Sequence, residues 1–145
     1  MILIAHRGNV EGINSARENT TTYIQEAIDA GFDVEIDVCK WDGDHFYLGH
    51  DEPGEAVSPE WLQDRPLWVH AKDHVALHEL VDRDIHCFWH NTDRYTLTSQ
   101  GWIWAYPGEP GNKRCICVHP EQRTDWEHFD GVCSDNIKSY KEKTQ

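Results

Sequence analysis

Short apolar runs recur along the chain, and each ends in or next to a polar or ionisable residue. Eight such runs occupy positions 2–5, 32–38, 46–48, 67–69, 87–89, 102–106, 115–118 and 131–133. Continuous apolar runs of this length are typical of strands buried on both faces, as in parallel sheets. The pattern therefore predicts eight strands with their polar groups gathered at the carboxyl ends.

Helical periodicity is clearest between the first two runs. Ser15 and Glu18 fit a capping box, with Ser15 as N-cap and Glu18 at the third helical position. An apolar stripe follows at 24–28, and Gly31 is a suitable stop. The other predicted segments are a helix over about 74–81, with Leu77, Leu80 and Val81 facing inward, single turns at 59–63 and 124–129, and a solvated tail at 138–143.

Eight strands pointing ionisable groups the same way predict an α/β fold, a minimal TIM-type (β/α)8 barrel. Such barrels typically have about 250 residues, or roughly 31 per unit. Here 145 residues shared by eight units leave about 18 for each, so several helices must be reduced to loops. We expect one compact domain, 1–145. Missing helices would expose apolar strand backs, and burying them against a second copy predicts a homo-oligomer, at its simplest a dimer.

Charge and composition narrow the function classes. Lys plus Arg number 13 and Asp plus Glu 26, so 13 − 26 gives a net charge of −13. An acidic chain of this kind is poorly suited to nucleic acid or to an anionic membrane surface. No apolar run is long enough for a transmembrane helix, and no signal peptide is visible, so we expect a cytoplasmic protein. The five cysteines lack zinc-site spacing and are expected to be buried thiols.

The second run carries a pair of carboxylates. Glu35 and Asp37 are two residues apart, so on a strand both face the same side. Two like charges repel there unless a cation lies between them. An edge strand with a solvent-facing acidic side and an apolar side of Val34, Ile36 and Val38 would account for this segment equally well.

Four short motifs together resemble the glycerophosphodiester phosphodiesterase family. In order they are His6-Arg7-Gly8, Glu18-Asn19-Thr20, Glu35-Ile36-Asp37 and Gly49-His50-Asp51. The family pattern reads roughly H-R-G, P-E-N-T, E-x-D and H-D, at similar spacing. The resemblance covers the first 51 residues. Beyond them, Val69-His70-Ala71-Lys72 stands where the family has an E-x-K strand end, and 132–135 are compatible with its last strand.

The resemblance implies a barrel fold and a metal-dependent phosphodiester hydrolase of lipid metabolism that acts on a small phosphodiester. Its metal ligands would be Glu35, Asp37 and His70, its acid–base pair His6 and His50, and its phosphate-binding cations Arg7 and Lys72. Family members use one divalent ion, Mg²⁺ or Ca²⁺. His70 in place of a carboxylate favours Mn²⁺ or Zn²⁺ if it is a ligand, and otherwise hydrogen-bonds phosphate.

Three further residues are candidates for substrate contact. His90 and His119 end the fifth and seventh runs, and Tyr106 ends an alternating aromatic run, so all three would face the same mouth. The two histidines could equally be strand-end residues with satisfied hydrogen bonds, and Tyr106 could equally belong to the barrel core.

Besides His70, two departures from the family pattern matter, the first for the helix entry and the second for the substrate pocket. Arg17 replaces the proline before Glu-Asn-Thr, and only 52–58 stand where the family inserts a pocket-forming segment. The resemblance therefore does not identify the alcohol group of the substrate, and we expect a shallow, open site. The alternatives are a non-catalytic phospho-ligand binding relic of the same fold and a lyase that releases a cyclic phosphate.

Overall fold

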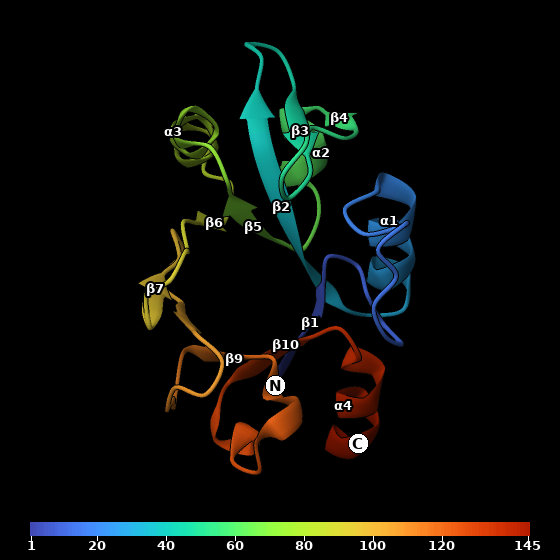
Figure 1. Cartoon of the computed structure of the whole chain (residues 1–145), viewed down its shortest axis with the longest axis vertical. Coiled ribbons are helices and arrows are strands. Elements are labelled where there is room, and N and C mark those ends of the chain that lie inside the picture. The colour runs from blue at the N-terminus through green and yellow to red at the C-terminus, as the bar shows by residue number, and fades with distance from the viewer.

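Seven parallel strands frame the fold in the computed structural model, which describes residues 1–145. They are β1 (Ile2–His6), β2 (Asp33–Trp41), β5 (Leu67–Ala71), β6 (Cys87–Phe88), β8 (Ile103–Ala105), β9 (Cys115–Val118) and β10 (Gly131–Ser134). Their order across the sheet is β6-β5-β2-β1-β10-β9-β8. Figure 1 shows the strands arranged around a common centre with the helices outside them.

The third predicted strand differs from the others in direction. β3 (Phe46–Leu48) runs antiparallel to the end of β2 and pairs in turn with β4 (Ala56–Val57). Only 42–45 separate β2 from β3, which is enough for a hairpin and too short for a parallel crossover. The expectation of eight equivalent parallel strands is therefore wrong at this run. β7 (Tyr95–Leu97) forms a second antiparallel edge against β8.

The parallel ladder is open between β6 and β8. No strand pairing joins these two, although the Ser99 backbone N–H donates to the Cys87 carbonyl at 2.8 Å across the gap. The sheet is thus mixed and ten-stranded, with a cyclic arrangement of its parallel part. The closed (β/α)8 barrel stays a prediction.

Four α-helices lie outside the strands: α1 (Thr21–Asp29), α2 (Pro59–Gln63), α3 (His74–Asp82) and α4 (Ile137–Thr144). The 3₁₀ turns η1 (Pro120–Gln122) and η2 (Trp126–His128) join β9 to β10, and no helix joins β8 to β9. The segments predicted at 59–63 and 74–81 are helical, although Val81 is exposed rather than inward-facing. None of the four helices has the length and apolar character needed to cross a bilayer.

Two sequence-based helix expectations are wrong. α1 begins at Thr21 with Thr20 as N-cap, so Ser15 is not the cap of this helix. Asn19 has a left-handed backbone (φ 57°), which separates the turns at 15–19 from the helix. The expected tail at 138–143 is part of α4, which buries Ile137 and Tyr140 against the sheet.

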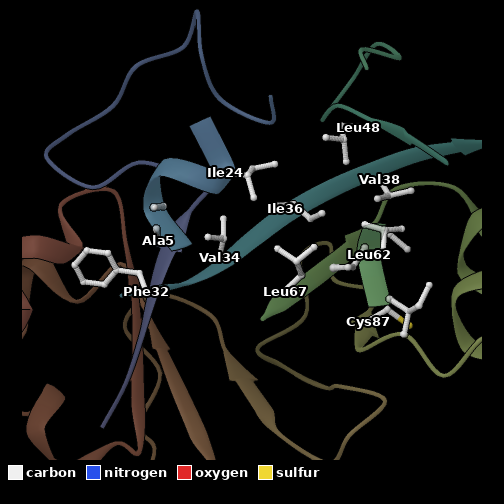
Figure 2. Packing of buried hydrophobic residues seen from close by; sticks show 14 of the residues in the cluster. Ala5, Ile24, Phe32, Val34, Ile36, Val38, Leu48, Leu62, Leu67 and Cys87 are labelled. Atoms are coloured by element: carbon white, nitrogen blue, oxygen red, sulfur yellow. The ribbon is translucent and has the colours of Figure 1, made fainter. Parts of the chain in front are cut away.

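Two apolar clusters divide the core. The larger lies between the strands and the helices and includes Ile24, Val34, Ile36, Val38 and Leu67 (Figure 2). The smaller fills the space inside the parallel strands and contains Ile4, Trp68, Phe88, Trp104, Ile116, Val118 and Cys133. None of its members comes from β2, whose inner face carries acidic side chains instead. All five cysteines are free thiols, four of them buried.

Apolar side chains are exposed where the β8–β9 crossover lacks a helix. Leu97 and Ile103 form a cross-strand pair, with exposed fractions of 68% and 36%. These side chains form an exposed apolar surface of the kind that self-association buries.

We predict that Leu97→Glu shifts the protein toward monomer, because a buried charge opposes association across this surface. Sedimentation velocity at micromolar concentration measures the change. Val81→Glu on α3, which alters a residue of 54% exposure, is the matched control and should leave the distribution unchanged. A wild-type monomer would contradict the prediction.

Candidate metal centre and active site

Ionisable side chains meet at the carboxyl ends of the central parallel strands. Strand register sets their neighbours: β1 aligns His6 with Glu35 of β2, and β5 aligns His70 with Asp37. Asp135 follows β10, which lies on the other side of β1. The structure thus brings together His6, Glu35, Asp37 and His70, which the sequence placed at the same edge.

Glu35, Asp37 and His70 form a compact set of potential metal ligands. Their side chains are 3%, 1% and 14% exposed. His70 Nδ1 lies 3.8 Å from Glu35 Oε1 and 3.4 Å from Asp37 Oδ1, and one ligand atom from each residue lies within 4.8 Å of the others. This spacing is compatible with a shared ion, because ligands about 2 Å from a metal lie roughly 3–4 Å apart.

A second contact fixes the orientation of the His70 ring. Its Nε2 lies 2.8 Å from the backbone carbonyl of His90, which only accepts, so Nε2 carries the proton. In the neutral ring, Nδ1 then presents a lone pair to the two carboxylates. Metal-ligating histidines have this arrangement, donating the other ring N–H to a carbonyl or carboxylate.

Two carboxylate oxygens of this set have no hydrogen-bond partner. Glu35 Oε2 and Asp37 Oδ1 are both buried, and neither accepts a hydrogen bond. An unsatisfied buried charged group is costly, and native proteins compensate such groups with partners or ions. The residues therefore fit a divalent cation, which would satisfy both oxygens and the lone pair of His70.

The two carboxyl groups have opposite pKa shifts. Burial, together with the negative charge of Asp37, raises the pKa of Glu35 to about 7. Burial would also raise the pKa of Asp37, but His70 in its protonated form, the charge of Arg7 and the hydrogen bond from Asn19 lower it to about 2. The ionised form of Asp37 is thus stabilised, whereas too little positive charge lies near Glu35 to stabilise its ionised form.

The loop after β1 holds Asp37 in place. Asn19 Nδ2 donates to Asp37 Oδ2 at 3.0 Å, and the Asp37 backbone N–H donates to Asn19 Oδ1 at 3.0 Å. Arg7 Nε lies 3.0 Å from the same Asp37 oxygen, while its Nη1 lies 3.5 Å from Glu18. Glu18 therefore holds Arg7 in place and Asn19 holds Asp37, and α1 begins only after these two residues.

A histidine–aspartate pair adjoins the carboxylates. His6 Nδ1 lies 2.7 Å from Asp135 Oδ1, an oxygen that also accepts from Asn9 Nδ2 at 2.8 Å. His6 Nε2 lies 3.6 Å from Glu35 Oε2. Burial lowers the pKa of His6, but the hydrogen bond that Nδ1 donates to Asp135 and the charges of Glu35 and Asp135 outweigh it and raise the pKa.

His119 extends this pair toward solvent. Its ring contacts that of His6 edge-on, with centroids 4.9 Å apart, and its Nδ1 lies 3.9 Å from Asp135 Oδ2. Burial and the neighbouring His6 lower the pKa of His119. His6, His119 and Asp135 form a second set of side chains with ligand atoms within 4.8 Å. Sequence reasoning missed Asp135, whose only signal was its place at the end of the last strand.

The remaining predicted residues lie outside the buried cluster. His50 is 38% exposed and pairs with Asp51 at 2.9 Å, although the preceding Gly49 N–H donates to the Asp37 carbonyl. No hydrogen bond or ion pair joins the side chains of His50, Lys72, His90 or Tyr106 to the carboxylates. His90 contributes its carbonyl to His70, while its ring pairs with Asp93 and lies 5.8 Å from the ring of Tyr106.

No family model, curated protein or solved structure matches the chain.

We predict that Glu35→Gln stabilises the metal-free protein at pH 8 and changes its stability little at pH 5. The folded state holds a proton on Glu35 up to about pH 7, whereas the unfolded chain releases it near 4.5. Rising pH across this window therefore destabilises the wild type, by about 3 kcal/mol. Urea unfolding in EDTA at both pH values measures the difference.

The control for this experiment is Glu127→Gln, which changes an exposed carboxylate and should shift neither curve. Equal effects of Glu35→Gln at pH 5 and pH 8 would show that Glu35 titrates normally.

Proposed function

We propose that the chain is a metal-dependent phosphodiester hydrolase of the glycerophosphodiester phosphodiesterase type that acts on a small phosphodiester. The observation that carries the proposal is the pair of buried, unpartnered carboxylate oxygens on Glu35 and Asp37, faced by the Nδ1 lone pair of His70. The motif resemblance over the first 51 residues supports it independently. We also propose that the seven parallel strands form a reduced TIM-type barrel.

Glu35, Asp37 and His70 would hold one divalent cation. Such an ion supplies Lewis acidity and neutralises the charge of the diester. Two carboxylates and one imidazole form a mixed oxygen and nitrogen set, so we propose Mn²⁺ or Zn²⁺ in preference to Mg²⁺ or Ca²⁺.

His6 is the proposed proton-transfer group. Because Asp135 accepts from Nδ1, the neutral ring has its basic lone pair on Nε2, the nitrogen that faces Glu35. Asp135 is a positioning residue that selects this tautomer and stabilises the protonated ring. This hydrogen-bonded pair favours catalysis over a binding relic, because binding alone would not need a basic nitrogen oriented into the site.

We propose His50 as the second proton-transfer group and Arg7 and Lys72 as the cations beside phosphate. Arg7 also compensates Asp37, so its contribution to phosphate binding comes from N–H groups other than Nε. The Lys72 backbone N–H donates to the Val38 carbonyl at 2.8 Å, its side chain makes no hydrogen bond or ion pair, and the residue follows β5 directly. His119, His90 and Tyr106 are proposed to contact the substrate at the rim.

We predict metal-dependent turnover of bis(p-nitrophenyl) phosphate that EDTA abolishes and Mn²⁺ or Zn²⁺ restores. Glu35→Gln and Asp37→Asn should each weaken metal binding by at least about 100-fold in calorimetry, because each removes a ligand. Glu127→Gln is the matched exposed control. Unchanged metal affinity in either site variant would refute the ligand assignment.

A glycerophosphodiester substrate with mass analysis of the products then separates hydrolysis from cyclisation. A monoester product supports the hydrolase, and a persistent cyclic phosphate supports the lyase.

We predict that Asp135→Asn lowers kcat by about 100-fold or more, since the variant alters the tautomer and charge of His6. Metal affinity should stay unchanged, because the Asp135 side chain forms no hydrogen bond or ion pair with Glu35, Asp37 or His70. Asp135 helps to raise the pKa of His6, so its removal should move the acid limb of the pH–rate profile to lower pH. Steady-state kinetics from pH 5 to pH 9 measures both effects.

Asp44→Asn disrupts another histidine–aspartate pair, the exposed His45–Asp44 contact at 3.3 Å, and should leave kcat unchanged. Full activity of Asp135→Asn with an unshifted profile would exclude the positioning role.

A further inference from the structure

A cavity of about 340 Å³ lies at the amino ends of the parallel strands, opposite the metal centre. β2 contributes to both ends, because Asp33 begins the strand and faces inward like Glu35 and Asp37. The lining residues that matter for its chemistry are Asp33, Arg65, Trp68, Asp84, His86 and Trp102.

Asp33 is a carboxylate without a cationic partner. Its Oδ2 accepts from Trp68 Nε1 at 2.9 Å, and no lysine, arginine or histidine forms an ion pair with it. Burial raises the pKa of Asp33, although the Trp68 N–H opposes this shift. The cavity therefore contains a negative charge that the protein leaves uncompensated.

Aromatic rings form one wall of the cavity. The Trp68 and Trp102 ring centroids lie 5.7 Å apart in an edge-to-face arrangement, and the His86 ring lies 4.4 Å from Trp68. Burial lowers the pKa of His86 to about 4, so this ring is neutral near pH 7. The face of an indole attracts a cation through its quadrupole. The Arg114 guanidinium, 4.8 Å from the Trp102 centroid, occupies one face of that indole, so a bound cation would have to contact the rest of the ring.

The charged side chains that line the cavity carry a net negative charge. Two carboxylates, Asp33 and Asp84, oppose one guanidinium, Arg65. Arg65 is committed elsewhere, since it donates to Gln25 and to the Trp61 carbonyl. The net charge of −13 adds a long-range attraction for cations.

We propose that this cavity binds a small organic ammonium ion, with Asp33 as its counter-charge and Trp68 and Trp102 as its aromatic contacts. An amine or quaternary ammonium ligand combines the charge and the apolar surface that this lining complements, and the volume suits a compact ligand. The site is separate from the metal centre and does not depend on the proposed hydrolase activity.

Calorimetric titration with tetramethylammonium chloride tests the proposal, at ionic strength held constant with NaCl. We expect saturable binding to the wild type and none of the uncharged analogue 2,2-dimethylpropan-1-ol. Asp33→Asn keeps an oxygen for the Trp68 N–H while removing the charge, and should weaken binding by at least about tenfold. Asp82→Asn, an exposed carboxylate on α3, is the matched control and should bind as the wild type does.

Two further variants keep the result interpretable. Trp102→Leu removes an aromatic contact without touching Asp33 and should also weaken binding. Glu35→Gln alters only the other end of β2 and should bind tetramethylammonium as the wild type does, whatever its effect on metal binding. Absence of saturable binding to the wild type, equal binding of the alcohol, or unchanged binding by both Asp33→Asn and Trp102→Leu would overturn the proposal.

Discussion

The burial of Glu35 and Asp37 on the inner face of one strand is the constraint on which this structure depends. Two neighbouring carboxylates removed from water are strongly destabilising unless positive charge or hydrogen-bond donors compensate them. Arg7 and Asn19 compensate Asp37. Glu35 makes ion-pair contacts only with His6 and His70, and burial together with the charge of Asp37 raises its pKa to about 7. This asymmetry supports the proposal that a cation binds here, because a cation would compensate the charge that Glu35 carries when it ionises.

The compensation of these charges determines the local architecture around them. The chain leaves β1 through a left-handed Arg7, and Asn19 is also left-handed, so the segment between them places its polar side chains on Asp37. α1 begins only after this segment. The β2–β5 register brings His70 beside Asp37, and the carbonyl of His90 beyond β6 orients its ring. Four segments therefore converge on one buried carboxylate pair.

The interior surrounded by the parallel strands is polar at both ends of β2 and apolar between them. Trp68, Phe88 and Trp104 fill much of the inner cluster, so large aromatic rings stabilise the centre of a short chain. Asp33 lies at the amino end of β2 and Asp37 toward its carboxyl end, on the same face. The two ends have different chemistry, because the proposed metal site offers carboxylates with a histidine and the cavity offers Asp33 with indoles.

The sequence alone determined which residues share a strand face and which lie at strand ends, because side-chain alternation is a local property of the extended backbone. That is why Glu35, Asp37, His6 and His70 were predicted to meet. Tertiary structure decided what depends on contacts distant along the chain. It reversed the strand before His50 into a hairpin, joined Asp135 to His6 across 129 positions, and replaced the Ser15 helix start with a loop that holds Asp37. Local propensity cannot specify these outcomes, because the free energy of compensating a buried charge depends on which distant groups reach it.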